Sequence, residues 1–571
     1  MSRIAPQPLL AGFGATLALA LAACSASHDE ATPSVVAPQA VPQAAEPVAT
    51  HERLQEQAAP AAARAREVRK AMPYAAPMIA PAPMSDGAGF GYRDAHREQY
   101  QKIEANPVQA VAEQPVSTFS IDVDTGAYAN VRRFLNDGSL PPRDAVRLEE
   151  LVNYFPYAYP KPEGDVPFSV ATELATTPWN PETRLLRVAI KAADLSVAEL
   201  PPANLVFLVD VSGSMDRREG LPMVQATLKL LVDQLRPQDR VALVTYAGTS
   251  SVVLESTAGS EKAKIRAAID RLSAGGSTAG ESGIQLAYQE AQKGLLKDGI
   301  NRILLATDGD FNVGISDFET LKQLAADKRK TGVSLTTLGF GAGNYNEQLM
   351  EQLADAGDGN YAYIDNLREA RKVLVDQLSS TLAVVAKDVK IQVEFNPAEV
   401  SEYRLLGYEN RALKREDFAN DKVDAGEIGA GHTVTALYEV VPVGAKGWLE
   451  PLRYARAAGD QDKPGEIAWL RLRYKAPEGG ASKLMERSIV KGKATPIAQA
   501  SDDLRFAAAV AAFAQQLRGG QYTGAFSLAD SATLARGARG DDPFGLRGEF
   551  VQLVELAQSL QTPQTVQVRA D

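Results

Sequence analysis

Cysteine and histidine are scarce in this chain of 571 residues, which contains one cysteine and four histidines. His28, His51, His96 and His432 are widely scattered, so the ligands needed for a structural zinc site are lacking. A single cysteine cannot form a disulfide within the chain. Clusters of Lys and Arg are missing as well, and the net charge is −11. That balance argues against nucleic acid as a partner, because neutralising phosphates takes clustered cations.

The N-terminus has the pattern of an export signal. Residues 9–22 are apolar behind a short start that contains Arg3, and this run is too short for a typical membrane span. It ends in Leu-Ala-Ala-Cys24, which resembles the bacterial lipobox. The resemblance implies a lipoprotein signal peptide over 1–23 and acyl chains on Cys24, which would anchor the protein stably to a membrane. The alternative is an ordinary cleavage site with an incidental cysteine.

Residues 24–115 are rich in Ala, Pro, Gln and Glu and contain few large apolar residues. Such a composition cannot bury enough surface to offset the entropy of the chain, so we expect a disordered N-terminal tether. As a random coil it would span on the order of 50 Å between its ends. That distance is enough to hold a domain away from a bilayer.

The most informative stretch begins with the apolar run 205–209, which has the pattern of a strand buried on both faces of a parallel sheet. It leads into Asp210, Ser212 and Ser214, three oxygen-bearing side chains at alternate positions. A tight turn after the strand can direct all three toward one point. One carboxylate and two hydroxyls suit a hard divalent cation such as Mg²⁺, which takes oxygen ligands and keeps several waters.

Two later stretches complete this pattern. Residues 275–280 form a Gly-rich loop that contains Thr278, and the apolar run 303–307 ends at Asp308 with Gly309 behind it. Because the carboxyl ends of parallel strands meet at one edge of a sheet, Asp308 should lie on the same rim as Asp210. The alternative is that these residues only form turns and helix caps.

The ordered set Asp210, Ser212, Ser214, Thr278 and Asp308 resembles the metal-ion-dependent adhesion site of von Willebrand factor type A domains. The resemblance implies that the cation, Mg²⁺ or alternatively Mn²⁺ or Ca²⁺, is not a catalyst. It would keep one coordination position open for an Asp or Glu carboxylate of a partner protein. No small-molecule substrate is expected.

The organisation of the chain agrees with that resemblance. Helical and strand patterns alternate over 200–386, which predicts a doubly wound, mostly parallel, Rossmann-like α/β sheet. Strand patterns at 166–199 and 387–475 suggest a β-sandwich-like domain into which the α/β domain is inserted. Residues 116–165 and 476–571 resemble the small helical N-terminal region and the helical C-terminal region of one bacterial family of these proteins, whose C-terminal domain has no known function.

Two other functions remain open. Asp122-Val-Asp124-Thr matches the nucleophile motif of haloacid-dehalogenase-type phosphatases, in which the first Asp is phosphorylated and the second is the acid/base. Residues 117–120 before it do not form a convincing buried strand, however. A purely structural envelope scaffold is the other alternative. The favoured prediction is a protein-interaction module anchored in the bacterial cell envelope, periplasmic or surface-facing. Ser25 after the cysteine slightly favours the outer membrane.

Overall fold

The computed structural model describes residues 98–561, except for 122–123, 165, 278–279, 310–317, 344, 424, 451–462, 464 and 493–494. Cys24, Asp122 and Thr278 lie outside the described residues, as do the predicted signal peptide and most of the predicted tether. In the part of the chain that is described, no helix is both long enough and apolar enough to cross a membrane.

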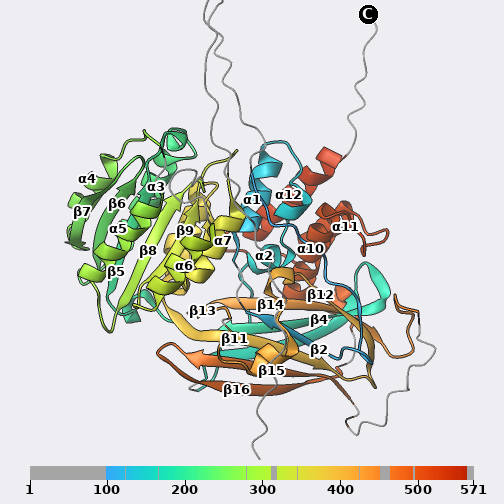
Figure 1. Cartoon of the computed structure of the whole chain (residues 1–571). Helices are drawn as coiled ribbons and strands as arrows, with labels where there is room; N and C mark the ends of the chain where they lie inside the picture. Colours follow the sequence, from blue (N-terminus) through green and yellow to red (C-terminus); the bar gives the residue numbers. More distant parts are fainter. Residues whose placement is uncertain are drawn as a thin grey trace, which may run out of the picture. The chain divides into compact units, whose positions relative to one another are not determined.

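A six-stranded sheet forms the α/β domain in the middle of the chain (Figure 1). Its strand order is β10-β9-β8-β5-β6-β7, and neighbours are parallel except for β7, which runs antiparallel to β6. The strands are β5 (Ala203–Asp210), β6 (Arg240–Tyr246), β7 (Ser250–Ala258), β8 (Ile300–Thr307), β9 (Ser334–Gly339) and β10 (Tyr361–Tyr363). The order reverses beside β5, where sheets of this kind bind their ligands.

Helices cover both faces of this sheet. Leu205, Phe207 and Val209 of β5 belong to one apolar core, and Val206 and Leu208 belong to the other. The first face carries α3 (Leu221–Gln234), α4 (Lys262–Asp270), α8 (Leu367–Arg371) and α9 (Leu378–Leu382), and the second carries α5 (Gly280–Lys293), α6 (Phe318–Arg329) and α7 (Glu347–Ala356). The predicted doubly wound fold is confirmed.

Two further sheets form a β-sandwich. One has the order β1-β12-β14-β4-β3, and the other has β13-β11-β15-β16 with β2 paired to β11. Val188 of β4, Ile391 of β11 and Leu470 of β15 are buried in the shared core. The strands are β1 (Gln109–Ala110), β2 (Val116–Ser120), β3 (Phe168–Thr177), β4 (Asn180–Ala192), β11 (Val384–Phe395), β12 (Val400–Leu406), β13 (Ile428–Gly429), β14 (Thr433–Pro442), β15 (Glu466–Ala476) and β16 (Gly479–Val490).

The α/β domain is inserted between β4 and β11 of this sandwich, as predicted. The direct link across the insertion is the antiparallel pairing of β4 with β14, whereas β3 joins the sheet through β4.

The limits of the sandwich differ from the sequence prediction. The prediction ended the β-rich part at 475 and expected a helical region afterwards, but β16 continues the sheet to Val490. Among the described residues this strand pairs with β15 alone, and most of its side chains are exposed. An exposed edge strand has little of the apolar alternation by which strands are recognised.

Order also begins earlier than expected. Glu98 accepts hydrogen bonds from Arg133 and from the backbone N–H of Gly343, each at 2.8 Å. Gln99 forms a β-bridge with Asn346, and β1 pairs with β12. The sequence predicts a tether over 98–115 because few of these residues are large and apolar. Hydrogen bonds hold the start of this segment, and Val111 is also buried in the core of the sandwich.

A helical layer packs on the outer face of the first sheet. Leu185 and Ala189 of β4 share a core with helices from both ends of the described chain, namely α1 (Gly126–Asn136), α2 (Leu148–Asn153), α10 (Asp502–Leu517), α11 (Leu528–Arg536) and α12 (Leu546–Gln561). Ser501 caps α10 by accepting the N–H of Leu504 at 3.2 Å. The predicted helical C-terminal region therefore begins at this cap.

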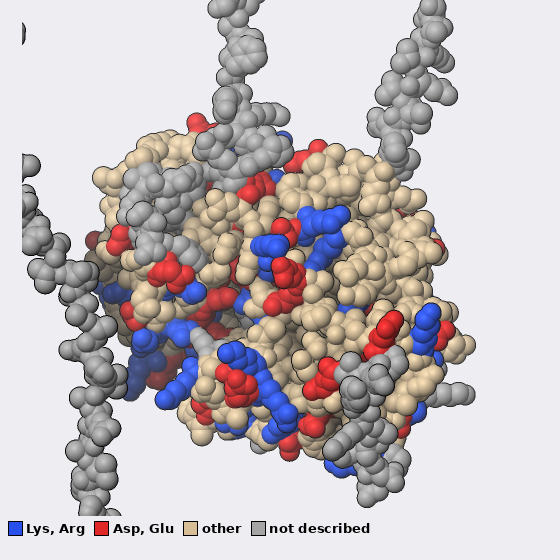
Figure 2. Space-filling view, turned by 45° about the vertical axis from the view of Figure 1, so that its right-hand side comes forward, with Lys and Arg blue, Asp and Glu red and all other residues tan. Residues whose placement is uncertain are grey.

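Charged side chains join the α/β domain to the helical layer. Arg132 of α1 donates to Asp365 at 2.6 Å, to Glu369 of α8 at 2.7 Å and to Glu549 of α12 at 3.0 Å. On the face in Figure 2, acidic and basic side chains are interspersed. That face presents no extended basic field of the kind that a nucleic acid requires.

Candidate functional site

Asp210 ends β5, and its fully buried carboxylate is fixed by neighbouring strands. Its Oδ1 accepts the backbone N–H of Ser212 at 2.9 Å. Its Oδ2 accepts the Thr307 hydroxyl at 2.9 Å and the Tyr246 hydroxyl at 3.1 Å. Thr307 ends β8 and Tyr246 ends β6. Three adjacent strand ends therefore set the position of this carboxylate.

A second carboxylate acts on Asp210 electrostatically. Burial raises the pKa of Asp210 to about 6, and the negative charge of Asp308 adds to that rise, whereas the N–H of Ser212 opposes it. Two buried carboxylates that repel each other favour a cation between or beside them.

The two serines follow in a tight turn. Gly213–Met215 is a single 3-10 turn, and Met215 is fully buried below it. The hydroxyls of Ser212 and Ser214 form a hydrogen bond, with their oxygens 3.0 Å apart. Neighbouring ligands of an octahedral Mg²⁺ lie about 2.8 to 3.0 Å apart, since each is about 2.0 to 2.1 Å from the ion. The serine pair therefore matches one edge of such a coordination shell.

The Gly-rich loop is held against this turn by backbone hydrogen bonds. Gly275 donates to the carbonyl of Val211 at 2.7 Å, and Gly213 donates to the carbonyl of Gly276 at 3.0 Å. Gly276 has φ +91°, which favours glycine. Thr278 lies two residues further on, outside the described residues.

Asp308 follows β8 on the same rim and is fully buried. The next residue, Gly309, has φ +81°, and a Cβ there would lie 2.9 Å from the backbone nitrogen of Asn346. Its N–H donates to the hydroxyl of Thr307 at 3.1 Å. The Oδ2 of Asp308 accepts a hydrogen bond from Nη2 of Arg217 at 2.9 Å.

The structure thus brings Asp210, Ser212, Ser214 and Asp308 to one rim. Within the described ranges, no group of three or more His, Cys, Asp or Glu side chains is placed to hold a metal, so a cation at this rim would depend on the serine hydroxyls. Tyr246, Thr307 and Arg217 also contact the rim and are not among the predicted site residues. The sequence places Tyr246 and Thr307 at strand ends, but their hydrogen bonds to Asp210 and the pairing of Arg217 with Asp308 depend on the fold.

Asp124, half of the phosphatase motif, lies in a different environment. Its buried carboxylate accepts the backbone N–H of Tyr361 at 2.8 Å and a hydrogen bond from Arg411 at 3.3 Å. These contacts tie the segment before α1 to β10 and to the sandwich. They are the contacts of a structural carboxylate.

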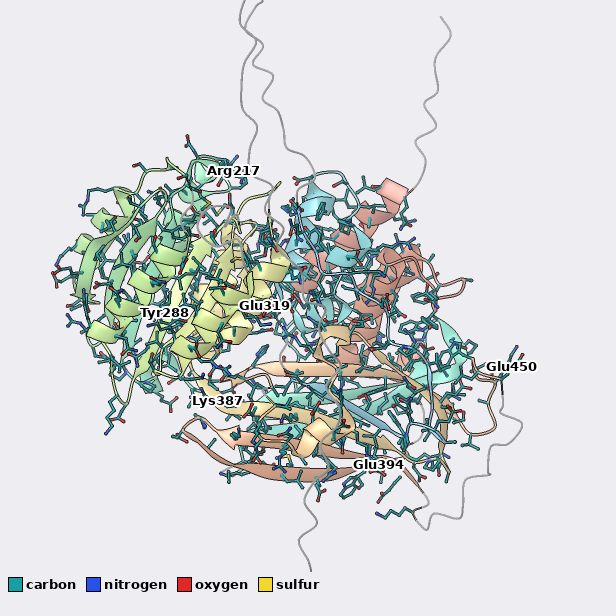
Figure 3. All side chains as sticks on the ribbon, viewed as in Figure 1. Arg217, Tyr288, Glu319, Lys387, Glu394 and Glu450 are labelled. Atoms are coloured by element: carbon teal, nitrogen blue, oxygen red, sulfur yellow. The ribbon has the colours of Figure 1, made fainter. Side chains whose placement is uncertain are left out.

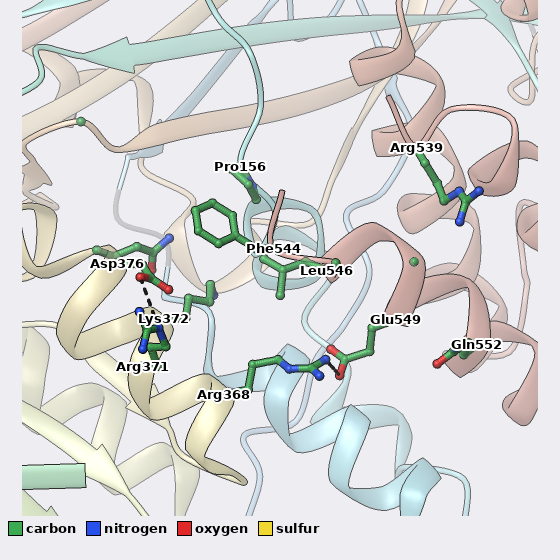
Figure 4. Close-up of a pocket in the computed structure, with 14 residues that line it drawn as sticks. Pro156, Arg368, Arg371, Lys372, Asp376, Arg539, Phe544, Leu546, Glu549 and Gln552 are labelled. Carbon is green, nitrogen blue, oxygen red and sulfur yellow. Dashed lines mark hydrogen bonds and ion pairs between the residues drawn. The ribbon is translucent and has the colours of Figure 1, made fainter. Parts of the chain in front are cut away.

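A cavity of about 740 Å³ lies between the end of the α/β domain and α12 and shares no residue with the rim (Figure 4). Two ion pairs, Arg368–Glu549 at 3.3 Å and Arg371–Asp376 at 3.8 Å, line it. Two of its basic side chains therefore have acidic partners, and the cavity is a separate feature of the fold.

Comparison with protein families divides the chain in a similar way. The von Willebrand factor type A domain model matches residues 204–377, and a model described as the C-terminal part of the uncharacterized protein YfbK matches 380–560. A further model, described as von Willebrand factor, matches 94–187. The described part of the chain is thus covered almost throughout.

Similar proteins include the uncharacterized protein YfbK of Escherichia coli, 52% identical over 468 residues that make up 80% of this chain and 81% of YfbK. The uncharacterized protein sll0103 of Synechocystis is 35% identical over 33% of this chain and 43% of its own length. Among solved structures, a von Willebrand factor type A protein from Catenulispora acidiphila is 16% identical, with a TM-score of 0.39 over 68% of this chain and 91% of that one. The sequence matches carry the assignment: the chain belongs to the family of von Willebrand factor type A domain proteins that includes YfbK.

Proposed function

We propose that this protein captures an acidic group of a partner protein through a divalent cation held at the rim of its α/β domain. The ligands would be Asp210, Ser212, Ser214, Thr278 and Asp308, and Mg²⁺ is the expected ion. Cys24 would carry the lipid that anchors the protein in the bacterial cell envelope. As a class, von Willebrand factor type A domains mediate protein interactions, which supports an interaction module.

The observation that carries this proposal is the 3.0 Å separation of the Ser212 and Ser214 hydroxyl oxygens beside two buried carboxylates. Two hydroxyls at this spacing can serve as adjacent ligands of one small cation.

The charges favour capture of a third carboxylate. Asp210 and Asp308 together neutralise a divalent cation only if both act on it at close range. Both oxygens of Asp210 already accept hydrogen bonds from the protein, so we expect Asp210 to act through a water. The cation would then retain attraction for an incoming Asp or Glu side chain.

The envelope location rests on the sequence. The apolar core before Leu-Ala-Ala-Cys24 supports lipidation, and the 52% identical relative is bacterial. The phosphatase alternative loses support because the Asp124 carboxylate is buried among structural contacts. We therefore assign no acid/base role to Asp124.

A crosslinked pull-down from bacterial envelopes tests the proposal. Wild-type protein, Asp308→Ala and the control Asp298→Ala would be compared in Mg²⁺ and in EDTA. Asp298 is exposed just before β8, at the opposite end of the strand from Asp308, so the control removes the same charge without touching the rim.

The expected result is a partner retained by the wild type and by Asp298→Ala in Mg²⁺, and lost in EDTA and with Asp308→Ala. Retention of the same partner by Asp308→Ala in EDTA would show that capture does not use this rim.

A further inference from the structure

Arg217 already supplies a positive charge to the rim. Its Nη2 lies 2.9 Å from Oδ2 of Asp308, and its Nη1 donates to the backbone carbonyl of Ala342 in the loop after β9. Figure 3 shows Arg217 at the top of the α/β domain, where the rim lies. Its side chain is 31% exposed, whereas that of Asp308 is fully buried.

The turn after the serines holds Arg217 in this place. The N–H of Arg217 donates to the carbonyl of Met215, and the N–H of Gly220 donates to the carbonyl of Arg217, each at 2.9 Å. A Cβ on Gly220 would overlap the carbonyl of Met215. The same short segment therefore supplies Ser212, Ser214 and the guanidinium group.

We propose that Arg217 is the resident counter-ion of Asp308, which the divalent cation displaces, and that the displaced guanidinium then becomes a second contact for the partner's carboxylate. This inference rests on the proposed function and identifies Arg217 as a residue that sets both the affinity for the metal and the preference for an acidic partner.

The divalent cation and Arg217 would compete because both bind the carboxylate of Asp308. An ion drawn to Asp308 attracts the carboxylate that Arg217 now binds, and its two positive charges repel the guanidinium. Both effects are strong at a buried carboxylate, where solvent screens charges poorly. Metal binding must therefore include the cost of breaking the Arg217–Asp308 pair.

The fate of the guanidinium follows from its second contact. The carbonyl of Ala342 would keep Nη1 near the rim after Nη2 is released. The partly exposed guanidinium would then face the solution from which a partner arrives. Its planar donors match a carboxylate geometrically, so the cation and Arg217 could together recognise one acidic group or two adjacent ones.

A purely structural role for Arg217 predicts the opposite effect on metal binding. If Arg217 only clamps the Ala342 loop against the rim, its loss should loosen the rim and weaken the binding of a cation. If it competes, its loss should strengthen that binding. Arg218 provides a matched control, because it is the exposed neighbour and its replacement removes the same charge.

The experiment is Mg²⁺ titration calorimetry on the full chain, comparing wild type, Arg217→Ala, Arg218→Ala and Asp308→Ala. We expect Arg217→Ala to bind Mg²⁺ about tenfold tighter than Arg218→Ala, because it lacks the competing charge. Equal or weaker binding by Arg217→Ala would overturn the inference.

The second measurement uses a fluorescein-labelled tetraglutamate peptide in saturating Mg²⁺, read by fluorescence anisotropy. In contrast to its tighter binding of Mg²⁺, Arg217→Ala should bind the peptide about fivefold more weakly than Arg218→Ala. Equal peptide affinity in these two variants would overturn the role of Arg217 as a second contact.

Failure of the proposed function gives a different pattern. If neither the wild type nor Arg217→Ala binds Mg²⁺, the metal site itself is wrong and the inference falls with it. If the wild type binds Mg²⁺ and Asp308→Ala does not, while Arg217→Ala matches Arg218→Ala, only the inference is wrong.

Discussion

The hydroxyl of Thr307 donates to Oδ2 of Asp210 at 2.9 Å, across the boundary between β8 and β5. The hydroxyl oxygen of Thr307 also accepts the N–H of Gly309 at 3.1 Å. One buried hydroxyl therefore positions the first carboxylate of the rim and the turn that carries the second, Asp308. These two hydrogen bonds of Thr307 explain how the rim is ordered before any cation binds.

Thr307→Val should lower both stability and metal affinity. The variant leaves the buried N–H of Gly309 without its acceptor and removes one donor to Asp210, at an expected cost of about 1 to 2 kcal/mol. Thr337→Val is the matched control, because the Thr337 hydroxyl is also buried and donates to the carbonyl of Met350 at 2.9 Å. Denaturant unfolding and Mg²⁺ calorimetry measure the two effects.

Both variants should lose comparable stability, but only Thr307→Val should lose Mg²⁺ affinity. If both retain wild-type affinity for Mg²⁺, Thr307 does not prepare the rim.

Arg132→Met should destabilise the fold strongly. Arg132 is buried and pairs with Asp365, Glu369 and Glu549, so its removal leaves acidic groups without their cation. Breaking a buried pair on one side costs about 3 to 5 kcal/mol. Lys161→Met, which breaks an exposed pair with Asp194, should have a much smaller effect. Equal unfolding midpoints in guanidinium for the two variants would show that the Arg132 cluster adds nothing.

Glu347 should make stability depend on pH. Its carboxyl is fully buried beside Arg147 and near Glu351, and burial raises its pKa from 4.5 to about 8. Between pH 4.5 and about pH 8, the Glu347 carboxyl therefore holds a proton in the folded state but not in the unfolded state. The stability from this group is complete below pH 4.5 and is lost as the pH rises toward 8. One pKa unit corresponds to about 1.4 kcal/mol, so the loss is on the order of a few kcal/mol.

Glu347→Gln should remove this loss, because the amide carries no charge at any pH in the window. Its free energy of unfolding should exceed that of the wild type above pH 8, and the difference should shrink toward pH 4.5. Glu319→Gln, at an exposed position at the start of α6, serves as the control. Urea unfolding at several pH values gives the result, and parallel curves for wild type and Glu347→Gln would contradict it.

Cys24→Ser should release the protein from membranes, since Cys24 is the proposed site of the lipid anchor. Ser27→Ala, three residues along, should leave the protein membrane-bound. Fractionation of cells that express each variant, with the mass of the mature N-terminus, measures both. A Cys24→Ser protein that stays membrane-bound and uncleaved would mean that residues 9–22 are themselves the anchor.

The sequence indicated the α/β domain well because its physical signals are local. The apolar run of β5 stops at Asp210, and that of β8 stops just before Asp308, so both strand ends and their shared rim could be inferred. The insertion could also be inferred, because alternating strand patterns stand on both sides of it.

Other features could not be inferred from local pattern. The exposed edge strand β16 resembles a polar loop in sequence, and residues 98–110 are held by hydrogen bonds to distant segments. The Arg217–Asp308 pair joins residues 91 positions apart, and only the fold brings them together. The role of Thr307 and Tyr246 also depends on the neighbouring strand, because each hydroxyl donates to Asp210 of β5.

The most direct test of the account is calorimetry with Mg²⁺ and with Mn²⁺ on wild type, Asp308→Ala and Thr278→Ala, with Asp298→Ala as the charge control. One divalent ion should bind the wild type and Asp298→Ala. Asp308→Ala should lose that binding while it remains folded, and Thr278→Ala should retain most of it. Equal metal affinity in wild type and Asp308→Ala would show that these residues only form turns.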